Sequence, residues 1–293
     1  MGRTFVSLPD YEITGRIGRG AGAIIYEARQ RATRQPVAIK HVVRHGPADE
    51  RFLEQAETEY AVAHTVSHEN LRRCLDVVRV RRWLKTRELF LVMELVEGEP
   101  LEQLLKPQPP PVEFDGLLDV FMQVAAGLHA LHKQGFAHAD IKPNNIIVSG
   151  RGGVKIIDFG QSCPLGHTKQ RVQGTPDFIA PEQVMRQPID QRTDVFNLGA
   201  TMYWSVTRKW FRTMMSPAPA GAKKIEIDAR AGNEPPATIN PAVPLPLSQL
   251  ILDCCETRKD DRPREMSQVI SRLEIVRHLL NRRRSDSAAR GSR

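Results

Sequence analysis

The hydrophobic pattern changes along the chain from short apolar runs to longer helical periods. Val37–Ile39 and Leu89–Met93 are apolar runs of strand length, and residues 47–66 between them have a helical composition. Apolar runs of this length are typical of buried strands, whereas helices need ten residues or more. The first ninety-odd residues are therefore expected to form short strands with one helix.

The rest of the chain has mainly helical patterns. From Leu117 to Leu131, apolar residues recur at steps of four and three, which places them on one face of a helix. Further helices are expected within Val195–Val206 and Met266–Leu280. Two short apolar runs, Ile146–Val148 and Val154–Ile157, flank a glycine-rich turn and predict a β-hairpin.

These patterns predict an α+β architecture with a β-rich half at about residues 1–96 and a helical half at about 97–281. A cleft between two such halves is a common place for a small-molecule site. Ser216–Pro246 contains seven prolines and no clear period, so we expect an irregular excursion there. Residues 282–293 are basic and rich in Ser, Ala and Gly, which predicts a disordered tail.

The net charge of +8 changes this picture little, because the basic residues are scattered. The clusters Arg72-Arg73, Arg81-Arg82 and Arg282–Arg284 are interpreted as solvated surface and tail, and no nucleic-acid partner is expected. The sequence contains no signal-like segment, no apolar run of about 18 residues and no disulfide-like cysteine spacing. We expect a cytoplasmic protein without a membrane segment; nothing in the pattern indicates an oligomeric state.

A glycine-rich segment, Gly18–Gly22, lies between two expected strands. Glycines would let backbone amides approach phosphate oxygens without a side chain in the way. The segment departs from the G-x-G-x-x-G pattern, because Ala23 stands at the third glycine. By itself such a segment is equally compatible with an ordinary hairpin.

Lys40 follows the apolar run Val37–Ile39, so it is either a strand end or a cation held against phosphates. The second role needs an acidic partner that fixes the ammonium group. Glu59 in the expected helix is the candidate, with Glu54 and Glu57 as neighbours that leave the choice open.

The most informative cluster is His138–Asn145, followed by Asp158-Phe159-Gly160. Asp140 could accept a hydroxyl proton and orient a nucleophile, and Lys142 could neutralise charge on a transferred group. Asn145 and Asp158 carry the oxygen ligands that Mg²⁺ prefers. Each residue alone has an ordinary structural explanation, but their joint spacing points to phosphoryl transfer.

Together these residues resemble the eukaryotic-like (Hanks-type) Ser/Thr protein kinases, in their bacterial branch. The resemblance extends over roughly residues 11 to 280 and implies the two-lobed kinase fold. Its segments, in the order of the family, are the glycine-rich loop, Val37–Lys40, His138–Asn145, Asp158–Gly160, Gly174–Pro176, Ala180–Glu182, Asp194–Gly199 and Asp261–Pro263.

The resemblance implies transfer of the ATP γ-phosphate to a Ser or Thr hydroxyl of a protein substrate, with Mg²⁺ or Mn²⁺ as the metal. It makes Asp140 the catalytic base, Lys142 its γ-phosphate partner, and Asn145 and Asp158 the metal ligands. The Lys40–Glu59 pair would hold the phosphates. The implied nucleotide-binding residues, with Met93 as gatekeeper and Glu94–Val96 as hinge, are Ile17, Gly18, Gly20, Gly22, Ile25, Ala38, Lys40, Met93, Glu94, Val96 and Ile147.

The resemblance also implies three structural interactions in the second half of the chain. Glu182 would form a buried ion pair with Arg262. Asp194 would hold the backbone of the loop that carries Asp140. Thr175 would contact the side chains of Asp140 and Lys142.

The chain departs from the family at Ala139, which replaces the arginine that usually precedes the catalytic aspartate. That arginine meets a phosphate on the activation loop and orders it. Between Asp158 and Glu182 the hydroxyl groups are those of Ser162, Thr168 and Thr175, and Thr175 has an implied structural role. We therefore expect activity that does not depend on phosphorylation of this loop.

Two alternatives are weighed against this interpretation. A pseudokinase scaffold is suggested by Ala23 and Ala139, yet it would be expected to lack Lys40, Asp140 or Asp158. A small-molecule kinase of the aminoglycoside-phosphotransferase kind also uses a His-x-Asp loop. Lys142 and the Gly174–Glu182 segment favour a protein kinase instead.

Overall fold

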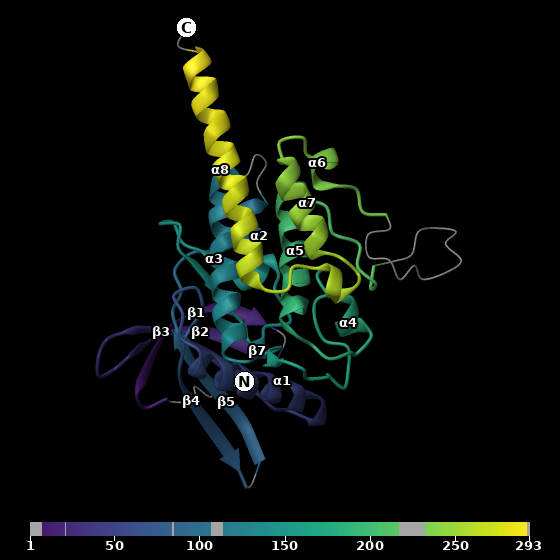
Figure 1. Ribbon diagram of the computed structural model, residues 1–293. Coiled ribbons are helices and arrows are strands. Elements are labelled where there is room, and N and C mark those ends of the chain that lie inside the picture. The colour runs from purple at the N-terminus through teal and green to yellow at the C-terminus, as the bar shows by residue number, and fades with distance from the viewer. Residues whose placement is uncertain (1–7, 21, 84, 107–113, 217–231, 292–293) are drawn as a thin grey trace. The chain divides into compact units, whose positions relative to one another are not determined.

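A five-stranded antiparallel sheet and one helix make up the first part of the chain (Figure 1). The structure, a computed structural model, describes residues 8–20, 22–83, 85–106, 114–216 and 232–291. The chain forms two units, described separately below. The N-terminal unit comprises residues up to 67, 71–97 and 158–160, and the C-terminal unit comprises 68–70, 98–157 and 161 onward.

The sheet of the N-terminal unit has the strand order β1-β2-β3-β5-β4. Its elements are β1 (Tyr11–Gly20), β2 (Ala23–Gln30), β3 (Pro36–Val43), η1 (Pro47–Asp49), α1 (Glu50–Thr65), β4 (Cys74–Arg82) and β5 (Lys85–Glu94). The expected strands and the expected helix are thereby confirmed. Successive strand residues point to opposite faces, so Val37 and Ile39 join the apolar core of one face while Ala38 and Lys40 lie on the other.

The C-terminal unit is mainly helical and contains two small sheets of short strands. Its helices are α2 (Leu101–Leu105), α3 (Phe114–Lys133), η2 (Pro143–Asn145), α4 (Pro181–Val184), α5 (Gln191–Thr207), α6 (Pro236–Ile239), α7 (Leu245–Cys254), η3 (Lys259–Asp261) and α8 (Met266–Gly291). Its strands are β6 (Glu99–Pro100), β7 (Phe136–Ala137), β8 (Ile146–Val148), β9 (Val154–Ile156) and β10 (Cys163–Pro164). The expected hairpin is confirmed, because β8 and β9 pair antiparallel from Ile146↔Ile156 to Val148↔Val154.

Helix α3 is the core helix of this unit and contacts α8, α5 and β9. In the described part of the chain it is the one helix long and apolar enough to cross a membrane by length and composition. Half of its apolar stretch is buried within the unit. Burial against neighbouring helices accounts for its apolar composition.

The last segment differs from the expected disordered tail, because α8 continues through Gly291 (Figure 1). Arg and Ala are good helix formers, and no glycine or proline interrupts the segment before Gly291. Arg277 and Arg284 also form ion pairs with Asp119 and Asp115 of α3. Charge and composition alone therefore mispredicted this end of the chain.

The proline-rich stretch Ser216–Pro246 is only partly described. Residues 217–231, on which the expectation of an irregular excursion mainly rests, lie outside the described residues. Its last part contains the short helix α6 and the beginning of α7. Asn240 Nδ2 donates to the backbone oxygen of Val206 at 2.8 Å, which holds this part against the end of α5.

We expect Gly199→Ala to lower the free energy of unfolding by about 1–3 kcal/mol, the usual cost of an overpacked core. A Cβ at position 199 would lie 2.6 Å from Cys254 Cβ and 2.8 Å from Cys255 Sγ, so α5 and α7 would have to separate. This cost exceeds the gain of about 1 kcal/mol in helix propensity. Urea unfolding measures the change, with Gly150→Ala as control because a Cβ at position 150 would have nothing within 4 Å of it. Equal stability of Gly199→Ala and the parent would contradict the close approach.

Candidate active site

Lys40 and Glu59 form the first element of the site, within the N-terminal unit. Lys40 Nζ lies 2.7 Å from Glu59 Oε2, and the Glu59 side chain is 1% exposed. The other carboxylate oxygen, Oε1, accepts from Arg72, which comes from the segment before β4. Glu59 therefore bridges two cations, and its position on α1 fixes where the Lys40 ammonium group lies.

The electrostatics of this cluster keep Lys40 charged. Burial disfavours the ammonium form, but the carboxylates of Glu59 and Asp158 outweigh burial, so the pKa of Lys40 is raised above its ordinary value. Asp158 Oδ1 lies 3.5 Å from Lys40 Nζ. Asp158 has a φ of +65° and its side chain remains 45% exposed. The cluster thus holds one partly exposed carboxylate beside a fixed ammonium group.

The glycine-rich loop joins β1 and β2. Gly18 and Gly20 pair with Ile25 and Ala23, and nothing would contact a Cβ at Gly20 within 4 Å. Gly22 has a φ of +70°, and a Cβ there would lie 2.4 Å from the ring of Phe52. The loop therefore has an open backbone surface at Gly20, which fits close approach by phosphate, and a strict glycine requirement at Gly22. Ala21 lies outside the described residues.

Strand register gathers several of the expected nucleotide-binding residues on one face of the sheet. Gly18 pairs with Ile25, Ile25 with Lys40, and Ala38 with Met93. Directly opposed residues share a face, and so do alternate residues of one strand. This face carries Gly18, Ile25, Ala38, Lys40 and Met93 together.

The remaining expected contacts of the N-terminal unit lie at the ends of β1 and β5. Ile17 is an exposed apolar residue, 52% accessible. Met93 is buried, and the next residue, Glu94, exchanges backbone and side-chain hydrogen bonds with Arg73. Val96 follows and is half-buried. Ile147 belongs to β8 of the C-terminal unit and is half-buried there.

Asp194 holds the loop that carries Asp140, within the C-terminal unit. Its carboxylate, fully buried, accepts from the backbone amides of His138 at 2.8 Å and Ala139 at 2.7 Å. His132 Nε2 lies 2.7 Å from the same carboxylate. Burial opposes the charge, but the bond from His132 and those from the loop hold the pKa of Asp194 below its ordinary value. The anion thereby fixes two consecutive peptide units directly before Asp140.

The Asp140 side chain lies between Lys142 and Thr175. Lys142 Nζ is 2.9 Å from Asp140 Oδ2, and the Thr175 hydroxyl donates to Asp140 Oδ1 at 2.8 Å. Lys142 also donates to Thr175 Oγ1 at 2.7 Å. This triangle joins the loop of Asp140 to the Gly174–Glu182 segment, and it confirms the expected Thr175 contacts.

Asn145 fits a metal-ligand role by its orientation. Its amide nitrogen donates to the backbone oxygen of Asp140 at 2.9 Å, which leaves the amide oxygen to face a cation. The described residues contain no cluster of three or more His, Cys, Asp or Glu that would hold a metal alone.

Glu182 and Arg262 form the expected buried ion pair. Arg262 donates to the two Glu182 oxygens at 2.8 and 3.0 Å, and both side chains are at most 1% exposed. Thr193 donates to Glu182 Oε1 at 2.7 Å. Gln183, next in the chain, donates to the backbone oxygen of Ala139 at 2.8 Å. The Gly174–Glu182 segment is thus attached both to the helical core and to the loop of Asp140.

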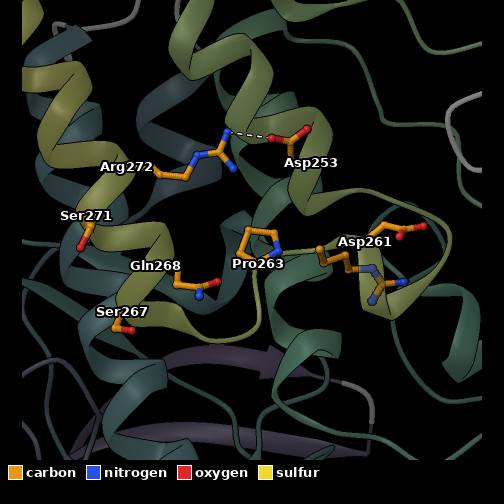
Figure 2. Close-up of a pocket in the computed structure, with 8 residues that line it drawn as sticks. Asp253, Asp261, Pro263, Ser267, Gln268, Ser271 and Arg272 are labelled. Carbon is orange, nitrogen blue, oxygen red and sulfur yellow. Dashed lines mark hydrogen bonds and ion pairs between the residues drawn. The ribbon is translucent and has the colours of Figure 1, made fainter.

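A pocket in the C-terminal unit lies where α7, η3 and the first turns of α8 meet (Figure 2). Its charged lining groups are already paired: Arg272 binds Asp253 at 2.7 Å, and the Arg262 guanidinium binds Glu182. The described residues that line it include none of the expected catalytic or nucleotide-binding residues. We therefore interpret it as part of the packing between α7 and α8 and not as part of the active site.

Residues 161–190 are anchored largely through the backbone. Strand β10 pairs with β7, Leu165 N donates to Gly135 O at 2.8 Å, and Ile189 N donates to His167 O at 2.9 Å. Lys169 is buried and donates to the backbone oxygen of Gln161. Burial lowers the pKa of Lys169. The segment is therefore ordered by groups of the protein itself.

The comparisons with known proteins agree with this geometry. The family model for the protein kinase domain matches residues 11–273, so the chain belongs to the protein kinase family.

Individual relatives are also similar over most of the chain. The chain is 29% identical over 272 residues to a probable serine/threonine-protein kinase of Clostridium acetobutylicum, covering 92% of this chain and 40% of that protein. It is 30% identical over 246 residues to the serine/threonine-protein kinase PknA of Mycobacterium tuberculosis, covering 82% and 55%. The chain thus spans about two fifths to just over half the length of these relatives. The family implies ATP and a divalent metal.

Several interactions in the structure confirm expectations from the sequence, whereas sequence analysis missed the roles of other residues. Glu59, rather than Glu54 or Glu57, is the partner of Lys40; Glu57 pairs with Arg79 instead. The interpretation of Arg72 as a solvated surface residue was wrong, because its side chain is buried against Glu59. His132 and Gln183 were also missed, since their partners lie 62 and 44 residues away and no local pattern marks them.

We expect Glu59→Gln to lower the free energy of unfolding by about 3 kcal/mol, because it leaves the buried Arg72 without its anion and Lys40 with Asp158 alone. ATP affinity should fall as well, since the Lys40 ammonium group loses its fixed position. Urea unfolding and calorimetric titration with ATP measure the two effects. Glu57→Gln is the matched control, because Glu57 is 39% exposed and its pair with Arg79 should contribute at most about 1 kcal/mol. Similar losses in both variants would contradict the bridging role.

Proposed function

We propose that this chain is an ATP-dependent serine/threonine protein kinase that phosphorylates hydroxyl groups of other proteins. The observation that carries the proposal is the Asp140–Lys142–Thr175 triangle, which attaches a reactive carboxylate to the Gly174–Glu182 segment. A substrate held by that segment would present its hydroxyl group to Asp140. The names of the relatives as serine/threonine-protein kinases support the proposal.

The charged residues of the site would have different roles in phosphoryl transfer, according to their positions. Asp140 would accept a hydrogen bond from the substrate hydroxyl and orient its oxygen toward the γ-phosphate. Lys142, 2.9 Å from Asp140, would neutralise charge on the transferred group. Lys40, fixed by Glu59, would hold the other phosphates. Most of the rate enhancement would come from positioning and preorganised charge, because the reaction needs little covalent participation by the protein.

Asn145 and Asp158 would hold the divalent metal, for which we propose Mg²⁺, with Mn²⁺ as a substitute. Both offer hard oxygen ligands, and the metal would supply charge neutralisation between neighbouring phosphates. We further propose a cytoplasmic location. The cysteines of this chain, all four of which are free and buried, fit a reducing compartment.

Two features favour this function over the alternatives. A pseudokinase has no need for a complete set of charged groups, yet Lys40 is held by Glu59, and Asp140 by Lys142 and Thr175. A small-molecule kinase has no need for a peptide platform. Here the Gly174–Glu182 segment is bonded to the loop of Asp140 through Thr175, and Gln183, the residue after it, adds a second bond.

The direct test is incubation of the purified chain with Mg²⁺-ATP and a generic basic protein, with phosphate read by intact mass. We expect phosphate on Ser or Thr of the substrate. Asp140→Asn should reduce the rate by about 10²-fold or more, the usual contribution of a positioned acid–base group. Asp10→Asn, an exposed aspartate of the N-terminal unit, should leave the rate unchanged. ATP binding without phosphate transfer by the parent would contradict the proposal and favour a pseudokinase.

We also propose that activity does not depend on phosphorylation of the 161–190 segment. Ala139 has no side chain that could bind a phosphate, and the segment is already anchored by β10, Leu165, Ile189 and Lys169. Ser162 is buried, with 5% exposure, which removes it from the reach of another kinase in this structure. Thr168 is exposed, and its hydroxyl therefore needs a direct test.

The double variant Ser162→Ala/Thr168→Ala should retain roughly the activity of the parent, because no phosphate is needed to order the segment. Thr175→Ala is the informative comparison in the same segment, and it should lose most activity, since Asp140 and Lys142 lose their shared partner. Steady-state kinetics on protein shown by mass to be free of phosphate measures both. Collapse of the double variant would show that loop phosphorylation is required.

A further inference from the structure

The β4–β5 hairpin ends in an exposed tryptophan. Trp83 is 91% exposed, whereas Trp204 is 6% and Trp210 48% exposed. Its φ is +58°, a conformation that is rare for a bulky residue and that hairpin turns usually fill with Gly, Asn or Asp. The next residue in the sequence is Leu84, which lies outside the described residues. Neither burial nor turn chemistry explains a tryptophan here.

Four cations surround this residue on both strands. Arg82 is paired across the hairpin with Lys85, and Arg81 with Thr86, so the two pairs point to opposite faces. Arg87 is the extra residue of a β-bulge, because Val80 pairs with Glu88 and Arg81 with Thr86. All four cations are exposed. Arg82 and Lys85 lie on one face of the hairpin end and Arg81 on the other, so positive charge flanks Trp83 on both faces.

These charges are not neutralised within the part of the chain that the structure describes. None of Arg81, Arg82, Lys85 and Arg87 forms an ion pair there, while Glu88 pairs with His41 and Glu57 with Arg79. Arg82 and Lys85 are directly opposed like charges, an arrangement that destabilises a hairpin. The sequence therefore concentrates positive charge at a place where it costs stability.

The tip also stands apart from the rest of its sheet. Pairing between β3 and β5 ends at Val43↔Glu88, so Arg81, Arg82, Lys85 and Thr86 pair only with one another. Figure 1 shows the β4–β5 hairpin extending beyond the other strands of the N-terminal unit. We call residues 81–83 and 85–87 the hairpin tip. Strand β3 does not extend along these residues.

We propose that the hairpin tip binds the surface of an anionic lipid bilayer. Tryptophan prefers the boundary between acyl chains and headgroups, and each Lys or Arg near an anionic bilayer adds to the attraction. An exposed tryptophan flanked by four exposed cations matches this boundary in both polarity and charge. A nucleic acid fits less well, because strand binding uses several stacked aromatic residues along a basic groove. The contact would be weak and reversible, and it goes beyond the proposed kinase activity.

Co-sedimentation of the full chain with vesicles tests the proposal. We expect binding to mixed phosphatidylserine/phosphatidylcholine vesicles, little binding to phosphatidylcholine alone, and weaker binding as salt increases. Trp83→Ala should reduce binding severalfold. Arg82→Gln/Lys85→Gln should reduce it about 25-fold, since each cation contributes about fivefold.

Arg29→Gln/Arg31→Gln is the matched control, because it removes two exposed cations from the same unit but far along the sheet from the tip. It should bind vesicles like the parent, and all variants should keep the parent's far-UV circular dichroism and phosphoryl-transfer rate. Absence of binding to anionic vesicles would overturn the proposal. An equal loss in the control would show that binding depends on overall charge only. Binding to a single-stranded oligonucleotide that is tighter than to vesicles and lost in Trp83→Ala would assign the tip to nucleic acid instead.

Discussion

The arrangement of the active site depends first on the buried carboxylate of Asp194. It accepts hydrogen bonds from the backbone amides of His138 and Ala139, two consecutive buried residues of the loop. A buried amide without a partner costs about 1–3 kcal/mol, and Ala139 has in addition a φ of +59°. The anion therefore stabilises a loop conformation that the local sequence does not favour. The direction of Asp140, the next residue, follows from it.

Glu59 and Glu182 are two further buried carboxylates that fix neighbouring groups of the site. Each is a buried carboxylate that binds an arginine outside its own helix, Arg72 and Arg262 respectively. Burying such pairs costs desolvation energy, so their net contribution to stability is small, whereas removal of one partner is expensive. These ion pairs contribute mainly by fixing the positions of the groups around them. Glu59 fixes the Lys40 ammonium group, and Glu182 fixes one end of the Gly174–Glu182 segment, whose other end carries Thr175.

The sequence predicted those parts of the fold and site that local patterns encode. The apolar period from Leu117 to Leu131 predicted α3, because only one side of that helix is apolar. Lys40, Asp140, Asn145 and Asp158 were identified by spacing and by resemblance to the kinase family. The pairing of Lys40 with Glu59 and of Asp140 with Thr175 was then confirmed by geometry.

Other features could not be predicted, because they depend on contacts between distant segments. Arg72 looked like a surface residue, since its sequence neighbours do not show that Glu59 lies beside it. The same holds for His132, whose partner Asp194 lies on α5. The helical end of α8 was missed because its basic composition suggested disorder, whereas Asp115 and Asp119 of α3 supply the compensating charges.

One buried anion, the carboxylate of Asp194, fixes the conformation of the loop that carries Asp140. Amide hydrogen exchange of the peptide spanning residues 136–142, compared between the parent and Asp194→Asn, tests it most directly. We expect exchange of this peptide to become at least about tenfold faster in Asp194→Asn, equivalent to a loss of about 1.4 kcal/mol, while peptides from α3 keep their protection. Unchanged protection of residues 136–142 would contradict it, because the loop would then be held by something other than this carboxylate.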